Sequence, residues 1–209
     1  MKKRVFVALA LALIWIALPV MSALAGAVTF HFSFKGQDAF AFFESFDSSG
    51  CIGTFVGVSA VDGSVKTGPG QPAVESSAFM FIDQFDFCTG ISLISAFGSN
   101  PLVADEFQID KNLNSATLNT AIVVCCDSSG TSFLVPVGVN WTGTGDPFRQ
   151  KNHFQIKTPG FKLNFRFDGT FRNAEASGSV SVGGTNLTPD PAVFAQMGSV
   201  KQGEVAIVH

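Results

Sequence analysis

The chain has 209 residues, which is enough to bury a sizeable hydrophobic core. Its net charge of −3, with charged residues at only 14%, argues against a general nucleic-acid-binding protein. The aromatic residues are 23 phenylalanines and two tryptophans, with no tyrosine. Because phenylalanine has no polar group, this composition predicts a phenylalanine-rich core rather than a sugar-binding platform.

Residues 1–25 have the layout of a secretory signal peptide. A basic start, MKKR, precedes an apolar run that ends at a proline, and the small-residue triplet ALA follows. We therefore predict cleavage after Ala25 or Ala27, and a secreted protein whose residues 26–209 form a single all-β domain with no membrane span. The alternative is an uncleaved anchor, because the apolar run could nearly span a bilayer.

Alternation of apolar and polar residues predicts antiparallel β-strands through most of the chain. The alternation is clearest in TFHFSF at 29–34 and in FKLNFRF at 161–167. Turn sequences such as KGQD, DSSG, VDGS and TPG recur at roughly the spacing expected of short strands. We predict an antiparallel β-sandwich of about ten short strands, with a closed β-barrel as the alternative.

Three hairpins can be registered, because a correct pairing must match apolar with apolar residues across the turn. The turns are the two DSSG tetrapeptides, at 47–50 and 127–130, and TPGF at 158–161. The expected pairs are Phe42 with Phe55, Phe40 with Gly57, Val124 with Phe133, Phe154 with Phe165, and Lys157 with Lys162.

The four cysteines are Cys51, Cys88, Cys125 and Cys126. Their spacing matches neither paired zinc knuckles nor a redox Cys-x-x-Cys motif, so we expect disulfides and no metal. Adjacent α-carbons lie about 3.8 Å apart, below the usual range for a disulfide. We therefore favour a Cys51–Cys88 bond and leave the state of the adjacent pair open. The alternative joins Cys51 and Cys88 each to one of the neighbours.

The sequence contains no catalytic motif such as G-x-S-x-G or H-E-x-x-H. His153 is expected opposite Arg166 on a solvent-facing side, which is a poor setting for a general base. We therefore predict a protein that is not an enzyme and needs no cofactor. A hydrolase whose carboxylates meet only on folding is the remaining catalytic alternative.

Basic residues concentrate late in the chain. Residues 149–172 contain six of them, in a protein with only 13 lysines and arginines. The TPGF hairpin would present Lys151, Lys157, Lys162 and Arg166 on one outward face. An anionic cell-envelope polymer or another protein could bind there. The competing interpretation is an ordinary solvated surface.

We therefore predict an exported, non-catalytic module for binding or for a structural role at a surface. Its anionic partner would contact the basic face of the hairpin, and no nucleic acid is expected as a partner. The alternative function is a β-barrel carrier of a small apolar ligand, which would need an internal cavity lined by phenylalanine.

Overall fold

The computed structural model describes residues 28–125, 132–182, 185–188 and 191–208, which form ten strands. The predicted signal peptide and Cys126 lie outside the described residues. All strand pairs are antiparallel, so the all-β antiparallel prediction is confirmed. The strands are β1 (Val28–Phe46), β2 (Ile52–Thr67), β3 (Ala73–Asp86), β4 (Ile91–Pro101), β5 (Phe107–Ile109), β6 (Ser115–Cys125), β7 (Phe133–Thr158), β8 (Phe161–Val182), β9 (Thr185–Asn186) and β10 (Phe194–Val208).

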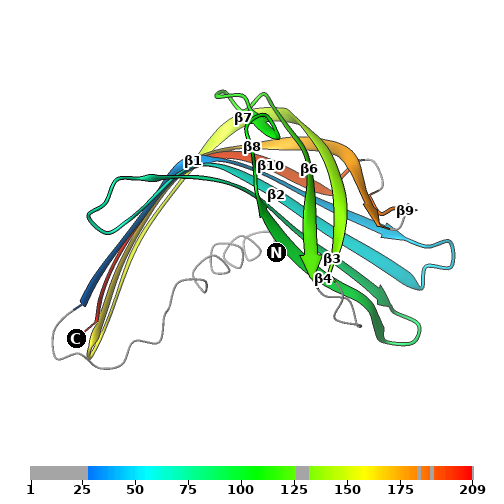
Figure 1. Ribbon diagram of the computed structural model, residues 1–209, viewed down its shortest axis with the longest axis horizontal. Helices are drawn as coiled ribbons and strands as arrows, with labels where there is room; N and C mark the ends of the chain where they lie inside the picture. The colour runs from blue at the N-terminus through cyan, green and yellow to red at the C-terminus, as the bar shows by residue number, and fades with distance from the viewer. Residues whose placement is uncertain (1–27, 126–131, 183–184, 189–190, 209) are drawn as a thin grey trace.

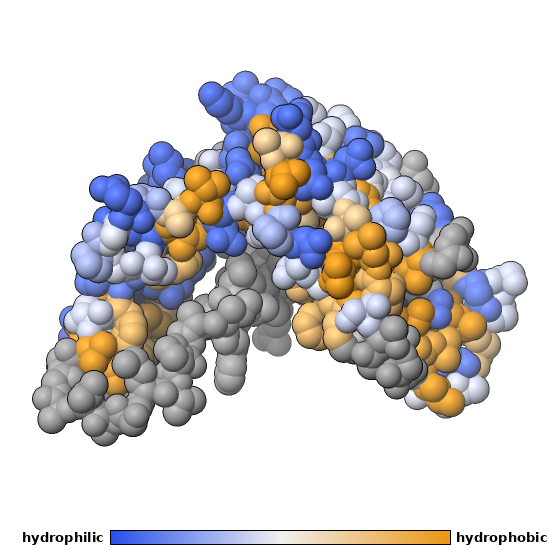
Figure 2. All heavy atoms as spheres, in the orientation of Figure 1, coloured by the Kyte–Doolittle hydropathy of each residue, from blue (hydrophilic) through white to orange (hydrophobic). Residues whose placement is uncertain are grey.

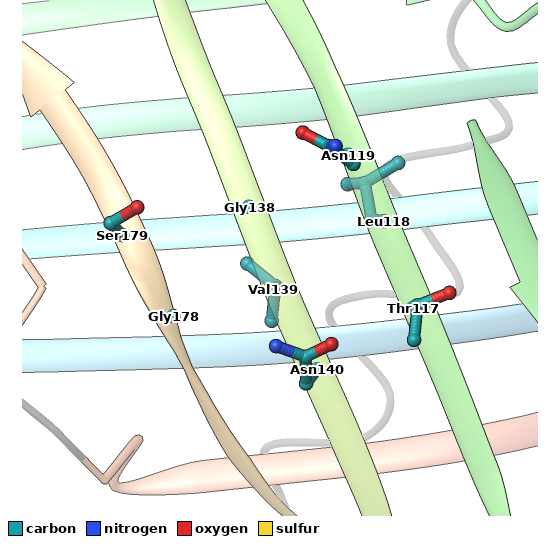
Figure 3. Close-up of a pocket in the computed structure, with 8 residues that line it drawn as sticks. All are labelled: Thr117, Leu118, Asn119, Gly138, Val139, Asn140, Gly178 and Ser179. Carbon is teal, nitrogen blue, oxygen red and sulfur yellow. The ribbon is translucent and has the colours of Figure 1, made fainter.

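Eight of these strands close into a ring. Their order is β10-β1-β2-β3-β4-β6-β7-β8, and β8 pairs again with β10. The sheet closes into a ring, as in the β-barrel alternative, but it is also folded so that two of its parts pack face to face, as in the predicted β-sandwich. Strands β6, β7 and β8 cross steeply over β1, β2 and β10 (Figures 1 and 3). Within the described residues, no helix has the length and hydrophobicity needed to cross a bilayer.

The hydrophobic core lies between the two crossing layers. Phe43, Met80 and Ile82 enter it from β1 and β3, and Val137 and Trp141 enter it from β7; each is at most 2% exposed. The indole Nε1 of Trp141 donates a hydrogen bond to the Phe40 carbonyl oxygen at 2.9 Å, which ties the two layers together. Large side chains therefore fill the interior where the layers cross.

Several strands are longer than predicted, because some turn sequences lie inside strands. KGQD is part of β1 and VDGS is part of β2, and their glycines, Gly36 and Gly63, are directly paired. The ring of Phe34 lies over both glycines, where a side chain on either would collide with it. At these positions the glycines do not form turns. They lie within strands and let an aromatic ring pack closely over the backbone.

Two of the three hairpin registers are confirmed. Val124 pairs with Phe133, Phe154 with Phe165, and Lys157 with Lys162. The register predicted for the first hairpin was wrong by two residues, because Gly57 pairs with Phe42 and not with Phe40. The cause is a longer turn: Asp47 Oδ1 accepts a hydrogen bond from the Ile52 amide at 2.9 Å, so Cys51 belongs to the turn. The faces of both strands are unchanged because the shift is an even number.

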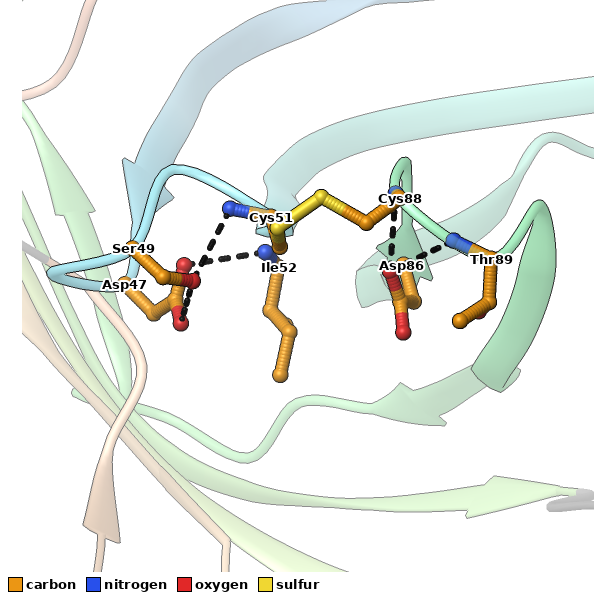
Figure 4. The surroundings of a disulfide bond; sticks show 7 residues. All are labelled: Asp47, Ser49, Cys51, Ile52, Asp86, Cys88 and Thr89. Carbon is orange, nitrogen blue, oxygen red and sulfur yellow. Dashed lines mark hydrogen bonds between the residues drawn. A yellow bond between two sulfur atoms is a disulfide. The ribbon is translucent and has the colours of Figure 1, made fainter.

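A disulfide between Cys51 and Cys88 joins the turn after β1 to the turn after β3, as predicted (Figure 4). The two α-carbons are 5.2 Å apart. Asp86 accepts hydrogen bonds from the amides of Cys88 and Thr89 at 2.8 and 3.1 Å. Hydrogen bonding to the Thr89 side chain is the main reason that the pKa of Asp86 is lowered, and the two amides add to it. Neither Cys51 nor Cys88 pairs with the adjacent cysteines, so the alternative connectivity is excluded.

Most phenylalanines lie on the outer side of the ring and not in the enclosed core. Near the disulfide they contact one another with ring centroids 5.0 to 6.3 Å apart. Figure 2 shows hydrophobic residues gathered over the end of the molecule where the β1–β2 and β3–β4 hairpins lie. One reason for this placement is that the rings cover glycines on the outer side. Phe81, for example, lies over Gly57. The contacting rings near the disulfide are Phe42, Phe46, Phe55, Phe81, Phe85 and Phe87.

Asp38 has a buried carboxylate oxygen, Oδ1, that accepts no hydrogen bond from the described residues. Its directly paired neighbours, Val61 and Gly198, are uncharged. Burial therefore raises the pKa of Asp38 from 3.8 to about 6. The folded protein therefore holds the proton of the Asp38 carboxyl group more tightly than the unfolded chain does. The contribution of this group to the free energy of unfolding is fully present below pH 4. It is lost as the pH rises through about 6, at a cost of about 3 kcal/mol.

Replacing Asp38 with asparagine is expected to remove this pH dependence. The variant and the wild type should have similar free energies of unfolding at pH 4, and the variant should be more stable by up to about 3 kcal/mol at pH 7.5. Urea unfolding at both pH values measures the difference. Parallel pH profiles for the two proteins would contradict a buried, unpaired carboxylate at this position.

Candidate functional site: a basic face on five strands

The far ends of β1, β2, β7, β8 and β10 form one sheet, which extends beyond the crossing with β6. In Figure 1 the ends of β1, β10 and the β7–β8 hairpin run together into the arm that carries the C-terminus. Paired residues of adjacent strands share a face. One face of this sheet therefore collects eight lysines and arginines, which we call the basic face: Lys35, Lys66, Arg149, Lys151, Lys157, Lys162, Arg166 and Lys201.

Like charges lie directly opposite each other on the basic face. Lys35 pairs with Lys201 across β1 and β10, and Lys157 pairs with Lys162 across β7 and β8. Such pairs destabilise a sheet, because the two side chains stand close together on the same side. The repulsion would be relieved by an anion bound between them.

A surface hollow of about 850 Å³ opens on the basic face. Lys66 and Arg166 stand on either side of it, and Ser33 and Gly203 lie between them in the same cross-strand row. Gly203 has open space where a side chain would project, so the floor of the hollow is uncovered backbone. An anionic group in the hollow would therefore lie between Lys66 and Arg166.

Asp168 is the carboxylate that neutralises part of this charge. Its oxygens accept hydrogen bonds from Arg149 at 2.8 and 2.7 Å, and Lys151 lies 3.6 Å away. The hydrogen bond from Arg149 is the main reason that the pKa of Asp168 is lowered. Within the described residues no ion pair involves Lys157, Lys162 or the other cations of the face. Those charges remain available to a partner.

All four basic residues predicted from the TPGF hairpin lie on the basic face. The prediction of an outward face was wrong, because the register places them on the same side of the sheet as the core residues Ala39 and Ala41. The same register leaves Phe154 and Phe165 on the outer side. His153 is opposite Arg166, as expected, and its Nε2 lies 2.9 Å from Asn164 Oδ1. The sequence missed Lys35, Lys66 and Lys201, which come from three other strands. Alternation in FHFSFK places Lys35 on a polar face, but nothing in the sequence indicates which distant strands lie beside it.

A second hollow, of about 550 Å³, lies on the outer side of β6, β7 and β8 (Figure 3). Asn119, Asn140 and Ser179 line it, while Gly138 and Gly178 leave the backbone bare between them. The lining is polar but carries no charge, so this hollow suits hydrogen-bonding groups and not an anion.

Neither hollow supports the two alternative functions. Glu204 is the only carboxylate among the residues lining them, so no acidic pair is brought together for hydrolysis there. Both hollows are open at the surface, whereas an apolar-ligand carrier needs an internal cavity. Among the described residues, no group of three or more histidines, cysteines or acidic residues could hold a metal ion.

No protein family and no curated protein matches this sequence. The ring of antiparallel strands and the basic face define an all-β protein with a cationic surface. The arrangement of these side chains is therefore the basis for inferring function.

Replacing Lys157 with glutamate is expected to stabilise the fold while weakening the basic face. The substitution turns a repulsive cross-strand pair with Lys162 into an attractive one, worth about 0.2–1 kcal/mol in the free energy of unfolding. The Lys157→Gln variant, which only removes the repulsion, should fall between the two in urea unfolding. A Lys157→Glu protein less stable than the wild type would contradict this pairing.

Proposed function

We propose that this protein is an exported, non-catalytic binding module that holds an anionic partner against its basic face. The observation that carries the proposal is the sheet register, which gathers eight cations from five strands on one surface. The acidic side chains that share this surface are Asp62 and Asp168, and the rest of the protein is acidic enough to give a net charge of −3.

Export is supported by the signal-peptide pattern in residues 1–25 and by the Cys51–Cys88 disulfide. Disulfides persist in oxidising compartments outside the cytosol. The partner would therefore be met outside the cell or in its envelope, where linear polymers carrying phosphate or carboxylate groups are accessible.

Binding of two linear polyanions, poly-L-glutamate and polyphosphate, tests this function by isothermal titration calorimetry. We expect binding that weakens as the ionic strength rises, because exposed charges are screened by salt. The triple variant Lys157→Glu/Lys162→Glu/Arg166→Glu should bind at least about tenfold more weakly. A preference for one polymer would identify carboxylate or phosphate as the recognised group.

Ser95→Glu/Ser99→Glu is the control, because it adds two negative charges at exposed positions of β4, a strand that contributes no residue to the basic face. This variant should bind like the wild type. The proposal is wrong if neither polymer binds, or if the triple variant binds as tightly as the wild type does.

A further inference from the structure

Strand β7 has a long uncovered edge beside the basic face. Strand β6 pairs with residues 133–142 of β7, but residues 148–158 pair with β8 alone. Within the described part of the chain no strand lies along the other side of this segment, and every residue from 145 to 160 is exposed. Eleven residues extend for about 36 Å, with alternate amide and carbonyl groups directed away from the sheet.

The side chains along this edge differ between the two faces of the sheet. Arg149, Lys151 and Lys157 point to the basic face, together with His153. The opposite face carries Phe154, whose ring stacks on Phe165 with centroids 4.7 Å apart, and also Phe148 and Ile156. These three apolar residues are 40–44% exposed, so the edge offers cations on one side and apolar contacts on the other.

A second copy of this chain is a poor occupant for the edge. If two β7 edges paired antiparallel about His153, the basic faces would join, and Arg149 of each copy would lie directly opposite Lys157 of the other. Like charges directly opposite each other are destabilising in a sheet. Lysine on an exposed edge is a common protection against such pairing.

An extended acidic segment has the complementary pattern. A strand that alternates acidic and apolar residues places all its carboxylates on one face and all its apolar side chains on the other. Added to the β7 edge, its carboxylates would reach Lys151 and Lys157, while its apolar side chains would contact Phe154 and Ile156. Its backbone would satisfy the amide and carbonyl groups of β7 that have no strand partner.

We propose that the anionic partner is an extended protein segment of alternating acidic and apolar residues, which adds to the free edge of β7 as a further strand. This inference rests on the proposed function, because it assigns a partner to the same basic face. It differs from binding of a polyanion by charge alone, since it requires backbone hydrogen bonds and an alternating sequence.

N-methylated peptides test the edge directly. The parent is a capped ten-residue peptide that alternates glutamate and valine, and its affinity is measured by fluorescence anisotropy against the complete protein. Along a strand, the amides of alternate residues point to opposite edges, so all glutamate amides share one edge and all valine amides share the other. Methylating three glutamate amides or three valine amides therefore blocks one edge at a time.

We expect one of the two methylated peptides to bind about a hundredfold more weakly than the parent and the other to bind like it. A peptide of the same composition, with five glutamates followed by five valines, should also bind more weakly than the parent. Equal binding of both methylated peptides, or of the block peptide and the parent, would overturn strand addition. So would absence of binding by the parent peptide.

Poly-L-glutamate, which lacks the alternation, separates this inference from the proposed function. If it binds the wild type but not the Lys157→Glu/Lys162→Glu/Arg166→Glu variant while strand addition fails, the basic face holds polyanions by charge alone. Loss of both results would overturn both the edge and the basic face as binding sites.

Discussion

Replacing Cys51 and Cys88 together with alanine is expected to lower the free energy of unfolding by about 4 kcal/mol. The disulfide closes a loop with a sequence separation of 37 residues, and removing it restores that conformational freedom to the unfolded chain. The bond also anchors two turns that meet at the end of β2 and β3, where Ile52 pairs with Asp86. The loss should therefore be large for a protein of this size.

Urea unfolding followed by circular dichroism measures this change. The hydrogen bond from the Phe87 amide to the Cys51 carbonyl oxygen, at 2.8 Å, remains in the variant. The native β-sheet spectrum should therefore persist in the absence of urea. A loss below about 1 kcal/mol would mean that the turns are held by their backbone contacts and not by the disulfide.

Replacing Trp141 with alanine is expected to cost about 3–5 kcal/mol in the free energy of unfolding. This side chain is 1% exposed and fills the space between the crossing layers, and its Nε1 bonds to the Phe40 carbonyl oxygen. Alanine would leave a cavity and remove the hydrogen bond between β7 and β1. Paired residues Ala116 and Ala176 on either side are too small to fill that cavity.

The Trp141→Phe variant separates the two contributions. It keeps most of the buried volume and loses the hydrogen bond, so it should cost about 1–2 kcal/mol in thermal or urea unfolding. If alanine and phenylalanine cost the same, the hydrogen bond and not the packing would dominate at this position.

Local pairing in this fold could be predicted from the sequence, but the arrangement of distant strands could not. The TPGF hairpin was registered correctly because a short turn leaves few alternatives, and apolar residues must match across it. Glycines in KGQD and VDGS were interpreted as turns, although Gly36 and Gly63 pair inside long strands under the ring of Phe34. A glycine in a strand and a glycine in a turn look alike when the covering residue is unknown.

The candidate site was predicted in part for the same reason. Lys157, Lys162 and Arg166 lie in one hairpin, so alternation alone places them on one face. Lys35, Lys66 and Lys201 join that face through the β1–β2, β1–β10 and β8–β10 pairings, which link residues far apart in the chain. The sequence therefore predicted a basic hairpin, whereas the structure has a basic sheet of five strands.

The affinity of poly-L-glutamate for a Lys35→Gln/Lys66→Gln/Lys201→Gln variant tests most directly whether five strands form one anion-binding surface. Binding about tenfold weaker than that of the wild type is expected, although the variant leaves the β7–β8 hairpin intact. The matched control makes the same change in net charge at exposed positions elsewhere that have no directly paired charge, with Ser92→Glu/Ser99→Glu/Thr117→Glu. Wild-type affinity in the lysine variant, or an equal loss in the control, would contradict a shared basic face.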